Sequence, residues 1–253
     1  MARSATPTLL ADPAVAAIPV HDCAEALVRL GRGRVAVSPR GPVAPVGPPR
    51  GDGGGTHAMV REGLAARLEA AADLLPRGLR LLVVEGYRPP AVQAALFEGY
   101  RRRIVRERPG LGAAESRTLA SRFVAPPAVA AHPSGAAVDV TLVDGRGRRA
   151  DMGTVIDATP EESAGACYFD APLIGASARA NRDLLAACLG AAGLVNYPTE
   201  WWHWSCGDRY WAFVTGAPAA VYGPVEPPAA RAVFAYRRSR QRSYASTATG
   251  SVG

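Results

Sequence analysis

The sequence of 253 residues lacks several features that mark common classes of protein. It contains no lysine, so all 29 basic residues are arginine, which we attribute to codon bias in a GC-rich genome. No stretch reaches about 18 consecutive apolar residues, so we expect no membrane-spanning helix. The amino-terminal stretch is interrupted by Asp12, Pro13 and Pro19, so we expect no secretion signal there either.

Cysteine is scarce and widely spaced. The four cysteines are Cys23, Cys167, Cys188 and Cys206, and no two of them form a CxxC pair. This spacing excludes a zinc ribbon and a CxxC redox motif. Four reduced thiols are typical of a cytoplasmic protein, and the cytoplasm is the location that we predict.

Charge is unevenly distributed along the chain. The formal net charge is +7, but residues 227–253 hold five arginines and no acidic residue. Residues 1–226 hold 24 arginines and 22 acidic residues, so the globular part is nearly neutral and we expect no nucleic-acid groove. The five arginines could bind an anionic polymer weakly, but we favour a solvated, disordered tail.

Composition divides the chain into three parts. Residues 38–55 are rich in proline and glycine and predict a linker or a long irregular loop. We therefore expect an amino-terminal segment with this linker (1–56), a catalytic domain (57–225) and a tail (226–253). With 48% hydrophobic residues, the chain can bury a sizeable core.

The apolar periodicity predicts a mixture of helices and strands. Helices are expected over 60–75, 92–104, about 113–123 and 177–189, and strands over 79–84 and 136–143. Residues 194–204 and 210–214 look extended, with a hairpin at Gly207-Asp208. Early helices, late strands and no regular alternation favour an α+β fold with an antiparallel β-sheet flanked by helices.

Two of the four histidines lie close to carboxylates. His132 precedes Asp139 by seven residues, and His203 follows Glu200 by three. Two histidines and one carboxylate suffice to hold a catalytic zinc with a fourth position open for water. The other carboxylate could then act as a general base. On a regular strand Glu200 and His203 would face opposite sides, so they can share a site only across a bulge or a helical turn.

Each of these features has a structural alternative. A histidine beside an aspartate more often forms a hydrogen-bonded pair than a metal site. The tryptophans around His203 could belong to the core. Cys206 could be imagined as a fourth ligand, but a catalytic site needs that position open.

Four short motifs follow one another along the chain. They are Glu85-Gly86-Tyr87-Arg88-Pro89, His132-x-x-Gly135-x-x-x-Asp139, Met152-Gly153-Thr154 and Glu200-Trp201-Trp202-His203. In order and spacing, residues 57–225 resemble the zinc D-alanyl-D-alanine dipeptidases of the vancomycin-resistance type. These are grouped with D,D-carboxypeptidases and with the amino-terminal domain of hedgehog proteins, which implies the same fold.

The resemblance assigns roles to individual residues. It implies one zinc ion per chain, held by His132, Asp139 and His203. It implies that Glu200 is the catalytic base and that Arg88 stabilises the transition state. Asp157 stands where the family places an aspartate that pairs with the substrate ammonium. The sequence departs from the family at Ala130, where many members have serine, and at Ile156, where an aromatic residue is usual.

The resemblance also implies a substrate. We expect hydrolysis of D-alanyl-D-alanine by Glu-assisted attack of zinc-bound water, a reaction of cell-wall peptidoglycan metabolism. The partner is then a small dipeptide, and neither a membrane nor a nucleic acid is expected. The alternatives are a D,D- or L,D-carboxypeptidase acting on peptidoglycan peptides, and a non-catalytic zinc-stabilised binding module. Glu200 and Arg88 argue against the module, which needs neither.

Overall fold

A computed structural model describes residues 7–31, 33–39, 41 and 55–227. The expected linker falls largely on residues 42–54 and the expected tail on residues 228–253, both outside this range. No helix among the described residues is long and apolar enough to cross a membrane. The elements in chain order are α1 (Pro13–Ala16), β1 (Leu27–Arg29), β2 (Val35–Val37), η1 (Thr56–Ala58), β3 (Met59–Arg61), α2 (Glu62–Asp73), β4 (Leu79–Glu85), α3 (Pro90–Glu107), α4 (Ala113–Ala120), η2 (His132–Ser134), β5 (Ala137–Asp144), α5 (Ala176–Ala191), β6 (Val195–Asn196), β7 (His203–Ser205) and α6 (Arg209–Thr215).

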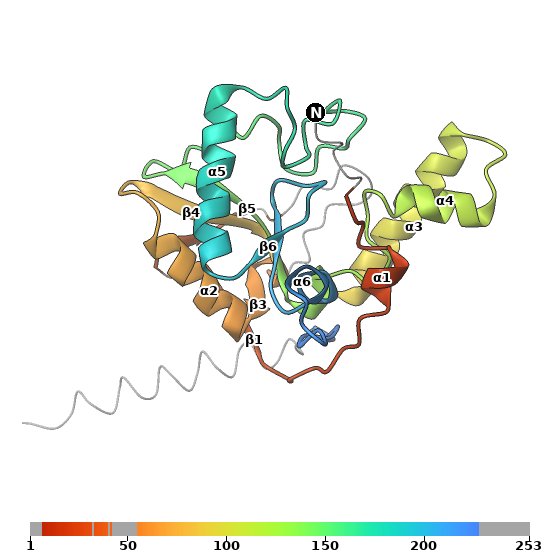
Figure 1. The fold of residues 1–253 in the computed structure, drawn as a ribbon, viewed down its shortest axis with the longest axis horizontal. Helices are drawn as coiled ribbons and strands as arrows, with labels where there is room; N and C mark the ends of the chain where they lie inside the picture. Colours follow the sequence, from red (N-terminus) through yellow and green to blue (C-terminus); the bar gives the residue numbers. More distant parts are fainter. Residues whose placement is uncertain (1–6, 32, 40, 42–54, 228–253) are drawn as a thin grey trace, which may run out of the picture.

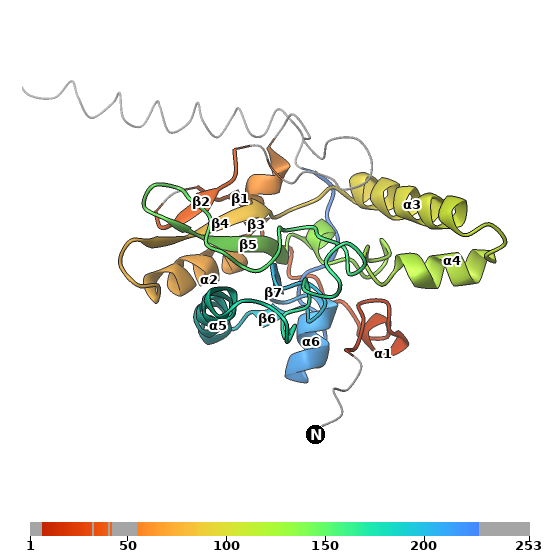
Figure 2. The same ribbon diagram turned by 90° about the horizontal axis from the view of Figure 1, so that it is seen from above.

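The strands form a five-stranded sheet and a smaller pair. The larger sheet has the order β2-β4-β5-β7-β6, and β1 pairs with β3. All pairs are antiparallel except β2 with β4 at one edge. Helices α2 and α5 pack beside each other against the sheet, and α3 and α4 project to one side (Figures 1 and 2). The expected α+β fold with an antiparallel sheet and flanking helices is confirmed.

The core lies between the sheet and helices α2 and α5. The apolar side chains that recur along the two helices meet alternate side chains of β5 there. The tryptophans near His203 are buried in the same cluster, as the structural alternative expected. Its largest members include Leu64, Leu68, Val138, Val140, Leu142, Leu185, Leu189, Trp201, Trp202 and Trp204.

The structure corrects the expected strand over 210–214, which is helix α6. The Asp208 side chain accepts hydrogen bonds from the backbone N–H groups of Tyr210 and Trp211, at 3.2 and 3.1 Å. Asp208 therefore caps a helix amino-terminus. Gly216, with φ of 71°, ends the helix in the left-handed region. The Gly207-Asp208 pair marks a helix start and not a hairpin.

Three smaller expectations also change. The helix expected from Val60 begins at Glu62, because Met59–Arg61 pairs with β1 as strand β3. The helix expected over 177–189 spans Ala176–Ala191 as α5, and its N-cap is Gly175. The stretch 194–204 contains only the two short strands β6 and β7, with a turn between them.

A buried arginine organises the long loop between β5 and α5. Arg182 has no exposed surface, and its guanidinium donates to the carbonyl oxygens of Met152, Ala166, Tyr168 and Phe169 at 2.6–3.1 Å. Met152 lies 14 residues before Ala166, so one side chain ties two separate parts of the loop together. Buried carbonyls without a donor are costly.

We expect Arg182→Met to destabilise the fold by about 3 kcal/mol or more, because methionine leaves several buried carbonyls without a donor. Urea unfolding followed by circular dichroism should show a lower midpoint. The matched control is Arg148→Met, since the Arg148 side chain is 75% exposed; it should unfold at the wild-type urea concentration. Equal midpoints for Arg182→Met and wild type would contradict the organising role.

Candidate active site

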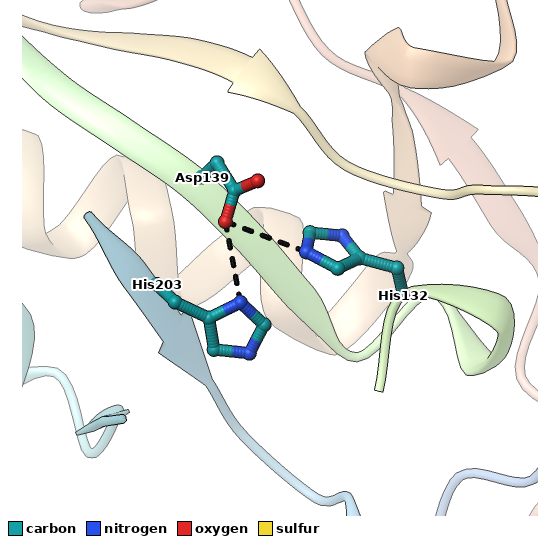
Figure 3. Close-up of side chains that lie close together, drawn as sticks. All are labelled: His132, Asp139 and His203. Atoms are coloured by element: carbon teal, nitrogen blue, oxygen red, sulfur yellow. Dashed lines mark hydrogen bonds and ion pairs between the residues drawn. The ribbon is translucent and has the colours of Figure 1, made fainter. Parts of the chain in front are cut away.

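Neighbouring strands bring the three predicted ligands together. Asp139 on β5 is the register partner of His203 on β7. His132 lies on η2, the 3-10 turn that leads into β5. Figure 3 shows the two imidazoles pointing at one carboxylate oxygen of Asp139. Motifs that are separate along the chain therefore meet at one site in the folded protein.

The three side chains form a compact, buried group. Asp139 Oδ1 lies 3.4 Å from His132 Nε2 and 3.2 Å from His203 Nδ1. Each residue is at most 5% exposed, and one potential ligand atom from each lies within 4.8 Å of the others. The group is suited to hold a metal ion. The alternative reading, a plain histidine–aspartate pair, does not explain why two imidazoles converge on one oxygen.

A backbone carbonyl fixes the orientation of His132. Its Nδ1 lies 2.7 Å from the carbonyl oxygen of Gly86. A carbonyl oxygen only accepts, so Nδ1 carries a proton, and Nε2 is the nitrogen that could present a lone pair to a metal ion. Metal-binding histidines commonly have such a carbonyl partner.

Burial and charge set the protonation of the carboxylates. Although burial by itself raises the pKa of Asp139, the two histidines outweigh it and hold that pKa below its usual range. Burial raises the pKa of Glu200 to about 8, and the charges of Asp139 and Asp157 add to this rise. Glu200 is thus the carboxyl of the site that most readily holds a proton.

A tight turn brings Glu200 to the same site as His203. The backbone N–H of Glu200 donates to Tyr197 O at 2.9 Å, and that of His203 donates to Glu200 O at 3.2 Å. Asn196 Nδ2 also donates to Glu200 O, at 3.0 Å. The carboxylate Oε2 ends 3.8 Å from His203 Nδ1. Glu200 and His203 share the site across a turn, as their spacing required.

Arg88 is held from two sides. Both oxygens of Glu85 accept from its guanidinium, through Nε at 2.8 Å and through Nη2. Nη1 donates to Gln93 Oε1 at 2.7 Å, and Gln93 Nε2 donates to Ala125 O. Burial opposes the charge of Arg88, yet Glu85 raises its pKa above the ordinary value. The Arg88 guanidinium therefore stays charged and is held in one position at the pocket.

Glu85 and Gln93 were not singled out from the sequence. Glu85 stands in the same short motif as Arg88, three residues before it, and that proximity could have suggested the pair. Gln93 carries no such signal, because it lies inside helix α3. Its part in the site depends on how α3 is placed against residues 121–125.

Two motif glycines allow close backbone approaches. A Cβ on Gly86 would lie 2.5 Å from Met59 O, and one on Gly135 would lie 2.4 Å from Leu27 Cδ2. Gly135 also has a positive φ of 68°. Both motifs therefore need glycine at these positions.

The loop after β5 carries Asp157 to the pocket. Asp157 has a φ of 66°, in the left-handed region that aspartate tolerates better than most residues. It lines the same pocket as Arg88 and Glu200. Ile156 packs against the core. In the third motif, Thr154 Oγ1 accepts a hydrogen bond from Trp201 Nε1 at 2.8 Å, which ties this loop to the Glu200 turn.

The pocket beside the ligand group is small and is lined by both polar and apolar residues. Its volume is about 50 Å³. The polar lining includes Arg88, Asp157 and Glu200. The apolar lining includes Ala130, the position at which the sequence departs from the family. The apolar lining residues are Leu10, Phe123, Val124, Ala125, Ala130 and Ala131.

The remaining candidates lie elsewhere. His21 is exposed, and His57 Nε2 contacts Ser38 O at 3.1 Å. Cys206 is buried and does not belong to the metal-binding group found among the described residues. The structure therefore leaves three protein ligands and gives no support for a fourth.

Comparison with known proteins agrees with this geometry. A family model described as D-ala-D-ala dipeptidase matches residues 56–215. The D-alanyl-D-alanine dipeptidase of Synechocystis sp. is 30% identical over 227 residues, covering 78% of this chain and 88% of that protein. The enzyme of the same name from Escherichia coli is 31% identical over 126 residues, which cover 50% of this chain and 54% of that protein.

A solved structure of the vancomycin resistance D,D-pentapeptidase VanY with Zn(II) matches at a TM-score of 0.34 and 18% identity, covering 64% of this chain and 80% of that one. The family match covers well over half of the chain. The chain therefore belongs to the D-ala-D-ala dipeptidase family and is a metallopeptidase.

Proposed function

We propose that the chain is a zinc-dependent dipeptidase that hydrolyses D-alanyl-D-alanine, with Glu200 as the base that activates water. One observation carries the proposal. A buried group of two histidines and one aspartate opens into the same small pocket as a carboxyl of raised pKa and a fixed arginine. This combination provides a metal-binding group, a proton carrier and a cation for developing negative charge.

The ligand group fits zinc. Nitrogen and oxygen ligands at 2.0–2.1 Å from a tetrahedral zinc lie about 3.3 Å from one another. Asp139 Oδ1 is 3.4 Å from His132 Nε2 and 3.2 Å from His203 Nδ1, close to that spacing. Three protein ligands leave one position open, as catalytic sites require. A zinc ion bound there would lower the pKa of its water towards about 7 and polarise the substrate carbonyl.

The chain's own residues supply the proton transfers. Glu200 lies beside the ligand group without belonging to it, so its carboxylate can take a proton from the attacking water. The same carboxyl can then pass that proton to the leaving amine. Burial raises its pKa, so the ionised form of Glu200 is a stronger proton acceptor than an exposed carboxylate.

Arg88 faces the negative charge that develops on the peptide oxygen. Glu85 and Gln93 hold its guanidinium in place before the substrate binds. A donor that is already fixed costs no reorganisation during the reaction, and one such donor is worth about 2.7–4 kcal/mol in comparable sites.

A free dipeptide matches the charged groups of this pocket. It carries an ammonium and a carboxylate close to the scissile bond, and Asp157 is our candidate partner for the ammonium. An acylated substrate has no ammonium and would lose this ion pair. We therefore expect kcat/KM for D-Ala-D-Ala to exceed that for N-acetyl-D-Ala-D-Ala by about 10²-fold or more.

Asp157→Asn tests the source of this preference. Asparagine also tolerates the left-handed backbone at this position, so the loop should keep its course. The variant should lose activity on the free dipeptide alone. The difference in kcat/KM between the free and the acetylated substrate should therefore become smaller. Comparable kcat/KM values for free and acetylated substrates in the wild-type protein would instead favour a carboxypeptidase acting on longer peptidoglycan peptides. Absence of any hydrolysis with zinc bound would favour a binding module.

The cellular setting is part of the proposal. Reduced thiols support a cytoplasmic location, where the substrate would be a free dipeptide from cell-wall metabolism. Three of the four unpaired cysteines, Cys167, Cys188 and Cys206, are buried.

A further inference from the structure

The amino-terminal segment reaches the active-site pocket. Leu10 lines it together with Arg88, Glu200 and His203, and is only 5% exposed. Residues before 56 lie outside the region that the family model matches. The family match therefore assigns no role to Leu10, although its side chain forms part of the pocket wall.

Leu10 is anchored next to a predicted metal ligand. Its backbone N–H donates to the hydroxyl of Tyr197 at 3.2 Å. The Tyr197 ring stands edge-on to the His203 ring, with centroids 6.0 Å apart. Val15 of α1 and Tyr210 of α6 pack in the same buried cluster. The position of Leu10 is thus tied to the element that carries His203.

The rest of the segment is fastened to the body of the protein. The N–H of His21 donates to Ala220 O at 2.8 Å, and that of Cys23 donates to Val221 O at 3.0 Å. Asp22 forms an ion pair with the buried Arg61 at 3.0 Å. Both views show α1 lying beside α6 (Figures 1 and 2). The segment is held by contacts before and after α1, so its position against the rest of the protein is fixed.

Leu10 is one of the apolar residues that line the pocket, together with Val124, Ala125 and Ala130. Apolar residues lining a small pocket accept an aliphatic side chain and limit its size. We propose that the amino-terminal segment completes the substrate pocket and that Leu10 restricts the substrate to dipeptides with small aliphatic side chains. This inference rests on the proposed dipeptidase function.

The test is a change of substrate preference. Leu10→Ala removes three carbon atoms from the wall. Kinetics would be measured with D-Ala-D-Ala, D-Leu-D-Ala and D-Ala-D-Leu. One methylene in an apolar pocket changes discrimination by about 10- to 200-fold. We expect the kcat/KM of at least one bulky dipeptide, relative to D-Ala-D-Ala, to rise about tenfold or more. Leu10→Val should shift the same ratio in the same direction by less.

Val15→Ala is the matched control. Val15 is fully buried in the same cluster as Leu10 but does not line the pocket. It should lower the melting temperature without changing the substrate ratio. An unchanged ratio in both Leu10 variants, or an equal shift in Val15→Ala, would overturn the proposal.

Binding separates this inference from the proposed function. The same dipeptides would be titrated by calorimetry into the zinc-loaded Glu200→Gln variant, with and without Leu10→Ala. A tenfold or larger shift in the ratio of Kd values would support the role of Leu10 even if the wild-type protein hydrolysed none of them. Unchanged Kd ratios would overturn the role of Leu10. They would not bear on the dipeptidase function, which the hydrolysis assay tests separately.

Discussion

Glu200→Gln should keep its zinc and lose nearly all turnover. The amide has the shape of the carboxyl but cannot take a proton from water, so kcat should fall by about 10²- to 10⁴-fold. The carboxylate lies outside the three-residue ligand group, so the metal content should stay at one ion per chain. Elemental analysis and steady-state kinetics on the same preparation measure both quantities.

Glu115→Gln is a suitable control for this substitution. Glu115 is exposed on α4 and does not line the pocket, so the change should affect neither zinc nor kcat. If Glu200→Gln lost its zinc, Glu200 would be a ligand and the base would have to be another residue. If it kept both zinc and turnover, no proton transfer would depend on Glu200.

The residues of the candidate site could be selected from the sequence because their motifs are short and local. His132 and Asp139 are separated by one turn and the start of a strand, and Glu200 and His203 by one turn. Few residue types can bind a metal ion or transfer a proton, so few positions in the sequence are candidates for these roles. That β5 and β7 are neighbours could not be derived from spacing, and the resemblance to a known family implied only that His132, Asp139 and His203 share one metal ion.

Residues that act through long-range contacts could not be predicted. Leu10 reaches the pocket by a hydrogen bond to a residue 187 positions away, and nothing in its local sequence distinguishes it from other leucines. Gln93 likewise serves Arg88 from inside a helix. Such contacts depend on the complete fold, because they join elements that meet only after the sheet has formed.

The mistaken strand over 210–214 has a local cause. Tyr210, Trp211 and Phe213 favour strands by propensity, and Gly207-Asp208 is common in hairpin turns. The Asp208 carboxylate instead caps two backbone N–H groups and begins a helix. Packing of Tyr210 against Tyr197 then stabilises that helix in its place. Capping and tertiary contact together override β propensity here.

His203→Ala should abolish metal binding and, with it, activity. The imidazole belongs to the three-residue group that could hold a metal ion among the described residues, and its loss would leave a histidine and an aspartate that cannot hold zinc tightly at micromolar concentrations. The matched control is His21→Ala, because His21 is exposed and outside the site. Dialysed wild-type protein and His21→Ala should each retain one zinc ion per chain, and His203→Ala should retain close to none.

His203 also packs against Tyr197, so circular dichroism must show that the His203→Ala variant is folded. A folded His203→Ala protein with full zinc content would remove His203 from the ligand set and leave the metal site to other residues.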